Sequence, residues 1–233
     1  VNVTVHGPRD GEPLWFVMGW GNTAEQPAVN WLIDALADAG FRTHAVEIPT
    51  NVREFEAEYL DPLAAAVEAG PAARRVLSHS TGGLIAAHAI DAGVLPGRAV
   101  HLSPWWGLHP SQRVLFRVLG AIPTSRELVT VSPDRETLGD LAEPGAREAI
   151  GLSPSFAREI RRAQSSLPPA GDEAAAVCTL TDGLVGTDAI GDRLPSERIH
   201  LYDGGHECFA SPGRREVVAD AVDALFDGPS ALG

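Results

Sequence analysis

The sequence predicts an α/β fold in which helices cover both faces of a mostly parallel β-sheet. Along most of the 233 residues, short β-branched runs alternate with longer amphipathic runs. The short runs are mostly apolar, as is typical of strands that are buried on both faces of a parallel sheet. One long interval in the second half of the chain lacks strong strand patterns and interrupts this alternation.

Seven runs are expected to form strands and four to form the covering helices. The expected strands are residues 1–5, 14–18, 43–48, 75–78, 99–102, 175–180 and 198–202. The expected helices are residues 27–39, 53–69, 81–92 and 213–226. In the first helix Leu32 and Leu36 recur at helical spacing while Asp34 points the other way, which predicts one buried and one exposed face.

The interval from residue 104 to residue 173 is too long for an ordinary connection between a strand and the next element. Its expected helices are residues 112–119, 134–141, 146–150 and 155–163, separated by prolines and without a strong strand. We therefore expect an α/β core formed by residues 1–103 and 174–233. Residues 104–173 are expected to form a helical insertion over the carboxyl edge of the sheet.

A serine lies where one expected strand turns directly into a helix. The segment from Arg75 to Gly83 reads Arg-Val-Leu-Ser-His-Ser-Thr-Gly-Gly, with Ser80 at the turn. A nucleophilic serine on such a turn needs small residues two positions away on both sides, and Ser78 and Gly82 meet this need. The pattern predicts Ser80 as a nucleophile, and a chance turn is the alternative.

A serine hydroxyl becomes a good nucleophile when a base accepts its proton. Among eight histidines, His206 has the most suitable surroundings, in the Gly-rich segment Asp-Gly-Gly-His-Glu before the last helix. His79 precedes Ser80, but consecutive strand residues face opposite ways, so we expect His79 to pack into the scaffold. No histidine or cysteine pair has the spacing of zinc ligands, so no metal site is expected.

The histidine in turn needs a carboxylate that orients its ring. In folds with a serine elbow, the acid follows the nucleophile and precedes the histidine along the chain. Asp182 does so at the end of the expected strand 175–180, in Thr-Asp-Gly-Leu-Val. Asp188 and Asp192 are rivals, although they fall where a helix or loop should follow. A helix N-cap is the non-catalytic alternative for Asp182.

An acyl-transfer site also needs backbone N–H groups that face the developing oxyanion. One expected donor is the amide of Thr81, directly after the predicted nucleophile. The second is the amide of Trp20, in the segment Met-Gly-Trp-Gly-Asn that follows the strand 14–18. The two glycines let this backbone turn toward a substrate, although an ordinary Gly-rich turn has the same composition.

Oxyanion loop, serine, aspartate and histidine occur in this order, each after an expected strand, and the sequence thereby resembles the α/β-hydrolase superfamily over nearly its whole length. Met-Gly-Trp-Gly resembles the His-Gly-x-Gly oxyanion loop, with Met18 at the histidine position. Ser-His-Ser-Thr-Gly-Gly is similar to the Gly-His-Ser-x-Gly-Gly elbow of small esterases and monoacylglycerol lipases, with Ser78 at the first glycine, and Gly-Gly-His-Glu is like their histidine loop. The resemblance implies an α/β-hydrolase fold, a helical cap at residues 104–173 and no cofactor.

Aromatic residues in the insertion indicate the kind of substrate. Trp105, Trp106 and Phe116 are expected to line an apolar pocket, and the alternative for the two tryptophans is to anchor the insertion to the core. Such a pocket suits a small to medium acyl ester, so the leading hypothesis is a serine carboxylesterase that acts through an acyl-enzyme on Ser80. The alternatives are an α/β-hydrolase that cleaves lactones, thioesters or carbon–carbon bonds, and a non-catalytic member that binds a small molecule.

The charge balance argues against polyanionic partners. The chain has 31 acidic and 18 basic residues, all of the latter arginine, and a net charge of −13. Such a protein is repelled by nucleic acids and anionic membranes, and no run reaches the apolar length of a membrane span.

Cys178 and Cys208 are expected to be reduced, and the first residues lack a secretory pattern, so a cytoplasmic location is expected. No feature indicates an oligomeric state.

The absence of lysine has two explanations that salt distinguishes. A GC-rich genome favours arginine codons, whereas a halophile accumulates carboxylates and loses lysine. In a halophilic protein, salt should relieve repulsion between carboxylates, because the screening length falls from about 10 Å at 0.1 M to about 3 Å at 1 M. We expect the melting temperature and the activity to rise between low and molar potassium chloride. A flat or falling melting temperature contradicts the halophilic interpretation.

Overall fold

A seven-stranded, mostly parallel sheet forms the centre of the computed structural model, which describes residues 1–143 and 149–232. The strands are β1 (Asn2–His6), β2 (Glu12–Val17), β3 (Phe41–Glu47), β4 (Arg75–His79), β5 (Arg98–Leu102), β8 (Ala174–Cys178) and β9 (Ile199–Leu201). Their order across the sheet is β1-β3-β2-β4-β5-β8-β9. Strand β1 is antiparallel to β3, and the other neighbours are parallel.

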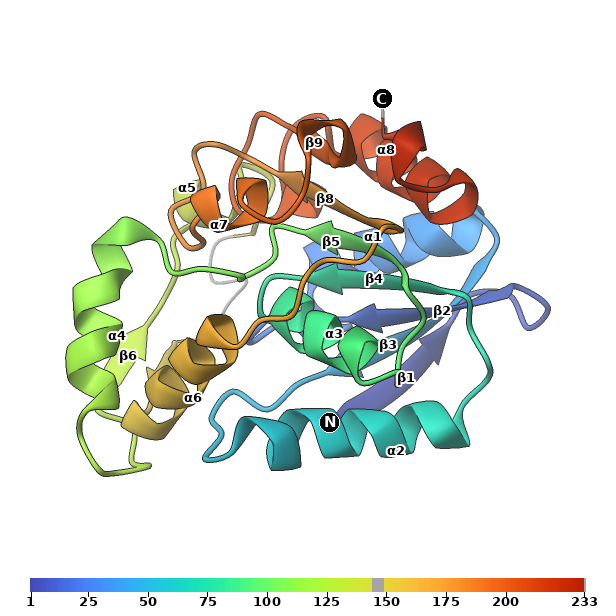
Figure 1. The fold of residues 1–233 in the computed structure, drawn as a ribbon. Coiled ribbons are helices and arrows are strands. Elements are labelled where there is room, and N and C mark those ends of the chain that lie inside the picture. The colour runs from blue at the N-terminus through green and yellow to red at the C-terminus, as the bar shows by residue number, and fades with distance from the viewer. Residues whose placement is uncertain (144–148, 233) are drawn as a thin grey trace.

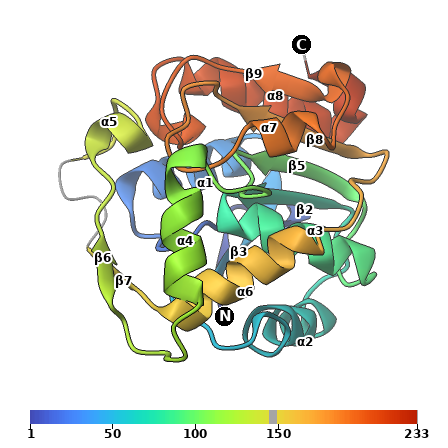
Figure 2. The ribbon, with the colours of Figure 1, turned by 60° about the vertical axis from the view of Figure 1, so that its left-hand side comes forward.

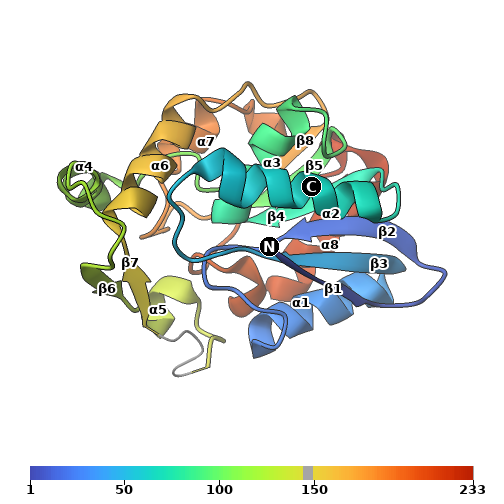
Figure 3. The same ribbon diagram turned by 90° about the horizontal axis from the view of Figure 1, so that it is seen from below.

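Helices cover both faces of this sheet, because its central strands are apolar on both sides. Helices α1 (Pro27–Asp38) and α8 (Arg214–Asp227) pack on one face, and α2 (Asp61–Ala69) and α3 (Thr81–Asp91) on the other, with α1 opposite α2 and α3 in Figure 3. Leu14 and Phe16 of β2 belong to the core between the sheet and helices α1 and α8. Trp15 and Val17 belong to the core between the sheet and helices α2 and α3. This alternation is the period of two that a strand imposes.

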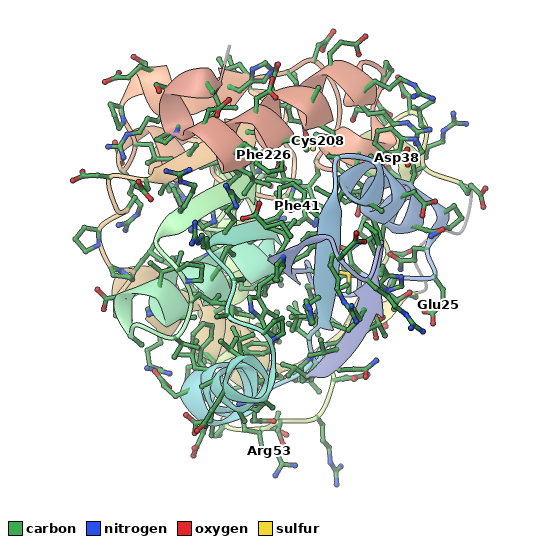
Figure 4. All side chains as sticks on the ribbon, turned by 90° about the vertical axis from the view of Figure 1, so that its right-hand side faces the viewer. Glu25, Asp38, Phe41, Arg53, Cys208 and Phe226 are labelled. Atoms are coloured by element: carbon green, nitrogen blue, oxygen red, sulfur yellow. The ribbon has the colours of Figure 1, made fainter. Side chains whose placement is uncertain are left out.

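The core under α1 and α8 extends to the end of the sheet that is remote from the carboxyl ends of the strands. There Phe41 of β3 stacks on Phe226 of α8, with ring centroids 4.7 Å apart. Figure 4 shows these two rings among the packed side chains, whereas Glu25, Asp38 and Arg53 lie at the periphery. These two apolar rings are therefore packed inside, whereas the three charged side chains remain in water.

The helix expected over residues 53–69 is present as two pieces. A wide turn, η1 (Glu56–Leu60), precedes α2, and the N–H of Asp61 donates to the carbonyl of Glu56, five residues back. Pro62 follows and has no N–H group with which to continue the usual ladder. The proline therefore marks the point where the bond pattern changes from the wide turn to the α-helix.

The interval between β5 and β8 forms a separate group of elements at one end of the molecule (Figures 1 and 2). They are η2 (Pro110–Gln112), α4 (Arg113–Gly120), β6 (Val129–Val131), α5 (Arg135–Leu138), β7 (Ile150–Leu152) and α6 (Pro154–Ser165). The antiparallel pair β6–β7 differs from the expectation of helices without strands. Each strand has three residues, too few to show a period of two. Of the helix expected at 146–150, residues 146–148 lie outside the described residues and Ile150 belongs to β7.

The remaining short helices are α7 (Asp188–Gly191), η3 (Ser196–Arg198), η4 (Cys208–Ala210) and η5 (Pro229–Ala231).

Cys178 and Cys208 are both buried free thiols. No described helix has the length and apolar character needed to cross a membrane. Within residues 1–143 and 149–232, no cluster of three or more histidine, cysteine or acidic side chains is arranged to hold a metal ion.

Candidate active site

Ser80 lies on the turn between β4 and α3, in a backbone conformation that non-glycine residues rarely adopt. Its φ is 51° and its ψ is −119°. The N–H of Ser80 donates to the carbonyl of Leu102, and its own carbonyl accepts from the N–H groups of Gly83 and Trp105 at 2.8 and 2.9 Å. A conformation of this kind costs about 1–3 kcal/mol and persists where surrounding bonds determine it. The turn places the serine side chain at the carboxyl end of a central strand.

Small neighbours are needed because α3 approaches β2 closely at this turn. A Cβ atom on Gly82 would lie 2.1 Å from the carbonyl oxygen of Val17, so no larger residue fits there. On the other side, the hydroxyl of Ser78 lies 2.7 Å from Nδ1 of His101, and both side chains are buried. Serine is accommodated at the position of the motif's first glycine because β5 supplies a hydrogen-bond partner.

His206 and Asp182 form a buried pair beside Ser80. The Nδ1 atom of His206 lies 2.7 Å from one carboxylate oxygen of Asp182, and the other oxygen accepts the N–H groups of Leu184 and Val185 at 2.8 and 3.0 Å. Burial raises the pKa of the Asp182 carboxyl, but the imidazole of His206 and the two amides outweigh it, so the pKa is lowered. The charged carboxylate holds the Nδ1–H of the ring, which leaves the lone pair of a neutral imidazole on Nε2.

The two rival aspartates lie elsewhere. Asp188, at the start of α7, forms an ion pair with Arg113 of α4 at 2.8 Å, and both side chains are largely exposed. Asp192 is an exposed residue at the end of α7. The turn after β8 therefore supplies the carboxylate that contacts His206.

Trp20 and Thr81 both lie at the site, and their role as oxyanion donors stays a prediction. Thr81 is the first residue of α3, and the N–H groups of a first helical turn have no carbonyl partner within the helix. The indole N–H of Trp20 donates to the carbonyl of Thr50, which fixes the ring. Gly21 has a φ of 74°, and a Cβ atom there would meet the side chain of Ile150, so the loop after β2 packs directly against the insertion.

A cavity of about 160 Å³ opens beside Ser80 and His206. Its walls are Trp20, Ser80, Thr81, Trp105, Gln112, Leu115, Phe116, Val131, Pro133, Leu152, Phe156, Leu184, Val185 and His206. Phe156 connects the aromatic part of the wall, since its ring stacks on Trp20 at 5.4 Å and lies 6.2 Å from Trp105. Among the described lining residues His206 is the one ionisable side chain, so the cavity suits an uncharged apolar group.

The structure corrects the expected position of Trp106. Trp105 and Phe116 line the cavity, and their rings meet edge to face at 5.5 Å. Trp106 lies outside the cavity, where its indole N–H donates to the carbonyl of Gly83 at 3.1 Å and its ring contacts His101. The backbone bends here, since the N–H of Trp106 donates to the carbonyl of Pro104 at 2.8 Å, and the two neighbouring side chains leave it in different directions. Trp106 therefore anchors the insertion to α3, which was the alternative considered for both tryptophans.

Several cavity residues were missed by the sequence analysis. Leu184 and Val185 reach the wall because they belong to the turn whose amides bind Asp182, a signal present in the segment Asp-Gly-Leu-Val. Phe156 is fully buried and shares a helical face with Ile160, a spacing that could have indicated it. Leu152 comes from the short strand β7, for which the sequence carries no clear signal.

Comparison with solved structures identifies the fold. A monoacylglycerol lipase from Paleococcus ferrophilus has a TM-score of 0.76 and 18% sequence identity, covering 97% of this chain and 99% of that chain. A soluble variant of monoglyceride lipase from Saccharomyces cerevisiae, in complex with a substrate analogue, has a TM-score of 0.77 and 14% identity, with coverage of 97% and 91%. Est1E from Butyrivibrio proteoclasticus, with ferulic acid bound, has a TM-score of 0.60 and 15% identity, with coverage of 97% and 93%.

These likenesses show that the chain has the α/β-hydrolase fold over nearly its whole length. They agree with the mostly parallel seven-stranded sheet. No family model and no curated protein sequence matches this chain. The likeness is therefore one of structure at low sequence identity.

The burial of His101 should make the fold sensitive to moderate acid. Complete burial lowers its pKa from 6.5 to about 4. Because the folded pKa lies below the unfolded one, the stabilisation is complete above pH 6.5 and is lost as the pH falls toward 4. We expect this group to reduce the free energy of unfolding by about 1.4 kcal/mol per pH unit within that window. Urea denaturation at pH 7, 6 and 5 measures the free energy of unfolding. In His101→Gln this free energy should fall less between pH 7 and pH 5 than in the wild type. An equal fall in both proteins contradicts the assignment.

Proposed function

We propose that this protein is a serine hydrolase that cleaves small to medium acyl esters through an acyl-enzyme on Ser80. The main support is that Ser80, on a strained turn, and His206, bonded to a buried carboxylate, line the same apolar cavity. Solved structures of the same fold are described as a monoacylglycerol lipase and a monoglyceride lipase, which favours ester hydrolysis among the chemistries of this fold.

In the proposed reaction the hydroxyl of Ser80 attacks the ester carbonyl while Nε2 of His206 accepts its proton. The N–H groups of Trp20 and Thr81 are the proposed donors to the resulting oxyanion. Collapse of the tetrahedral intermediate breaks the ester C–O bond, and His206 returns the proton to the departing alcohol. Water then attacks the acyl-enzyme by the same route and releases the acid. Asp182 remains a carboxylate throughout and stabilises the imidazolium.

The lining of the cavity supports an acyl ester as the substrate class. Apolar residues from the insertion, including Leu115, Phe116 and Phe156, make up seven of the fourteen lining residues. A hydrocarbon chain would exchange water for these contacts, which contributes roughly 0.8 kcal/mol for each buried methylene. A charged acyl group would lose its hydration without gaining an ion pair among the described lining residues. The proposed substrates are therefore esters whose acyl group carries no charge.

Ser80→Ala should abolish ester hydrolysis and leave the fold intact. Removal of a triad nucleophile lowers turnover by on the order of 10⁶-fold. Hydrolysis of p-nitrophenyl esters with acyl chains of increasing length measures the activity, and circular dichroism checks the fold. A fluorophosphonate should add one adduct to the wild-type protein at Ser80 and none to the variant. Activity near the wild-type level in folded Ser80→Ala contradicts the proposed function.

Asp182→Asn should lower turnover strongly while KM changes little. An asparagine at this position favours the wrong tautomer of the catalytic histidine, and in a serine protease that change costs on the order of 10⁴-fold. Asp188→Asn is a matched control, since it removes a carboxylate from the same region and breaks an exposed ion pair with Arg113. The control should retain its activity. A harmless Asp182→Asn together with a crippled Asp188→Asn contradicts the proposed acid.

A further inference from the structure

Asn22 lies where three loops of the site meet, and neither the sequence analysis nor the proposed reaction gives it a role. It ends the segment Met-Gly-Trp-Gly-Asn after β2, and its N–H donates to the carbonyl of Gly19 at 3.0 Å. Its side chain is buried, with 4% exposure. From there it contacts His79, which precedes the nucleophile, and Glu207, which follows the proposed base.

The hydrogen bonds of this side chain fix its orientation. The Nδ2 atom of Asn22 lies 3.1 Å from a carboxylate oxygen of Glu207 and 3.2 Å from the side-chain oxygen of Gln26. The NH₂ group of Gln26 donates to the carbonyl of Gly21 at 2.9 Å, so the oxygen of Gln26 faces Asn22, and the Asn22 atom that meets it must be the NH₂ group. The carbonyl oxygen of Asn22 then faces Nδ1 of His79 at 3.0 Å, and this nitrogen must carry the proton. One amide therefore sets the tautomer of His79.

The contacts around this amide leave little freedom to move. A Cβ atom on Gly19 would lie 2.6 Å from both the carbonyl oxygen of Asn22 and Nδ1 of His79. The ring of His79 in turn lies 4.9 Å from the ring of His206 and contacts Phe209 edge to face. The first glycine of the proposed oxyanion loop is thus packed on the Asn22–His79 bond, and the proposed base is packed on the same imidazole.

The bond between Asn22 and Glu207 is buried. Glu207 is 4% exposed, and a buried polar side chain that loses its hydrogen-bond partner destabilises the fold. The Asn22 amide therefore ties the loop after β2 to the residue next to His206 through a contact that is costly to break.

We propose that Asn22 is a positioning residue, which aligns the N–H of Trp20 with Ser80 and His206 through its bonds to His79 and Glu207. This inference rests on the proposed hydrolase function. Its consequence is specific, because loss of the bridge should displace the oxyanion donor without removing any group that touches the substrate. A displacement of about 1 Å can reduce turnover by on the order of 10²-fold.

Asn22→Asp tests this bridge, because it keeps the size of the side chain but sets a carboxylate against Glu207. With p-nitrophenyl butyrate at a temperature well below melting, we expect kcat to fall by on the order of 10²-fold and KM to change little. Glu207→Gln in the same chain supplies an amide donor to the new carboxylate and restores the bond with its direction reversed. The double variant Asn22→Asp/Glu207→Gln should recover most of the lost kcat.

The matched control is Asn2→Asp. Asn2 also donates its amide to a glutamate, Glu47, at 3.2 Å, but this pair is exposed at the edge strand β1. The control should keep the kcat of the wild type. An unchanged kcat in Asn22→Asp, or a double variant no better than the single one, overturns the inference, because a residue that only stabilises the fold would change the melting temperature alone.

If Asn22→Asp does not fold, Asn22→Ala provides the same test, since it adds no carboxylate beside Glu207. A folded Asn22→Ala with unchanged kcat overturns the proposal, and one whose kcat falls at constant KM supports it. The rate at which a fluorophosphonate modifies Ser80 gives a second readout that depends on no particular ester. A wild-type protein that reacts with neither probe contradicts the proposed function itself, whereas a reactive wild type with equally reactive Asn22 variants contradicts the present inference.

Discussion

The backbone of Ser80, held at a φ of 51°, is the constraint to which its whole neighbourhood is adapted. A turn this tight brings α3 against the end of β2, so the second residue of the helix, Gly82, has no room for a side chain. Ser103, which follows the neighbouring strand β5, also has a positive φ, of 41°, and its N–H donates to the carbonyl of Val177 at 2.7 Å. Trp105, two residues later, donates its N–H to Ser80. The conformation of the first residues of the insertion is therefore coupled to the conformation of the turn at Ser80.

Burial of polar groups gives this site its chemical character. The carboxylates of Asp182 and Glu207 and the ring of His206 all lie out of water, although the protein as a whole carries a net charge of −13. In such surroundings a fixed dipole or charge acts far more strongly than it does in water. The same burial makes each of these groups depend on a partner, and Asn22 and the amides after Asp182 supply such partners. Burial is therefore the reason why these groups act strongly on one another and also why each of them depends on the position of its partner.

Much of the fold could be predicted because its signals are local. Strand and helix patterns that depend on spacing within one segment, such as Leu32 and Leu36, agree with the structure to within a few residues. Pairs that form between distant segments are different. The bond between Asn22 and Glu207 joins residues 185 positions apart, and nothing within either segment indicates it. The choice between Trp105 and Trp106 likewise depended on how the backbone bends between β5 and the insertion, and composition cannot decide that.

The insertion takes part in the site as well as covering it. The N–H of His206 donates to the carbonyl of Thr137 at 2.9 Å, and the N–H of Glu207 donates to the carbonyl of Leu138 at 2.7 Å. These bonds join the loop of the proposed base to α5 of the insertion, while Gly21 in the loop after β2 packs against Ile150 of β7. A change in the insertion can therefore alter both the shape of the cavity and the placement of the imidazole. In this molecule the segment expected to determine specificity is also bonded to the groups expected to perform the chemistry.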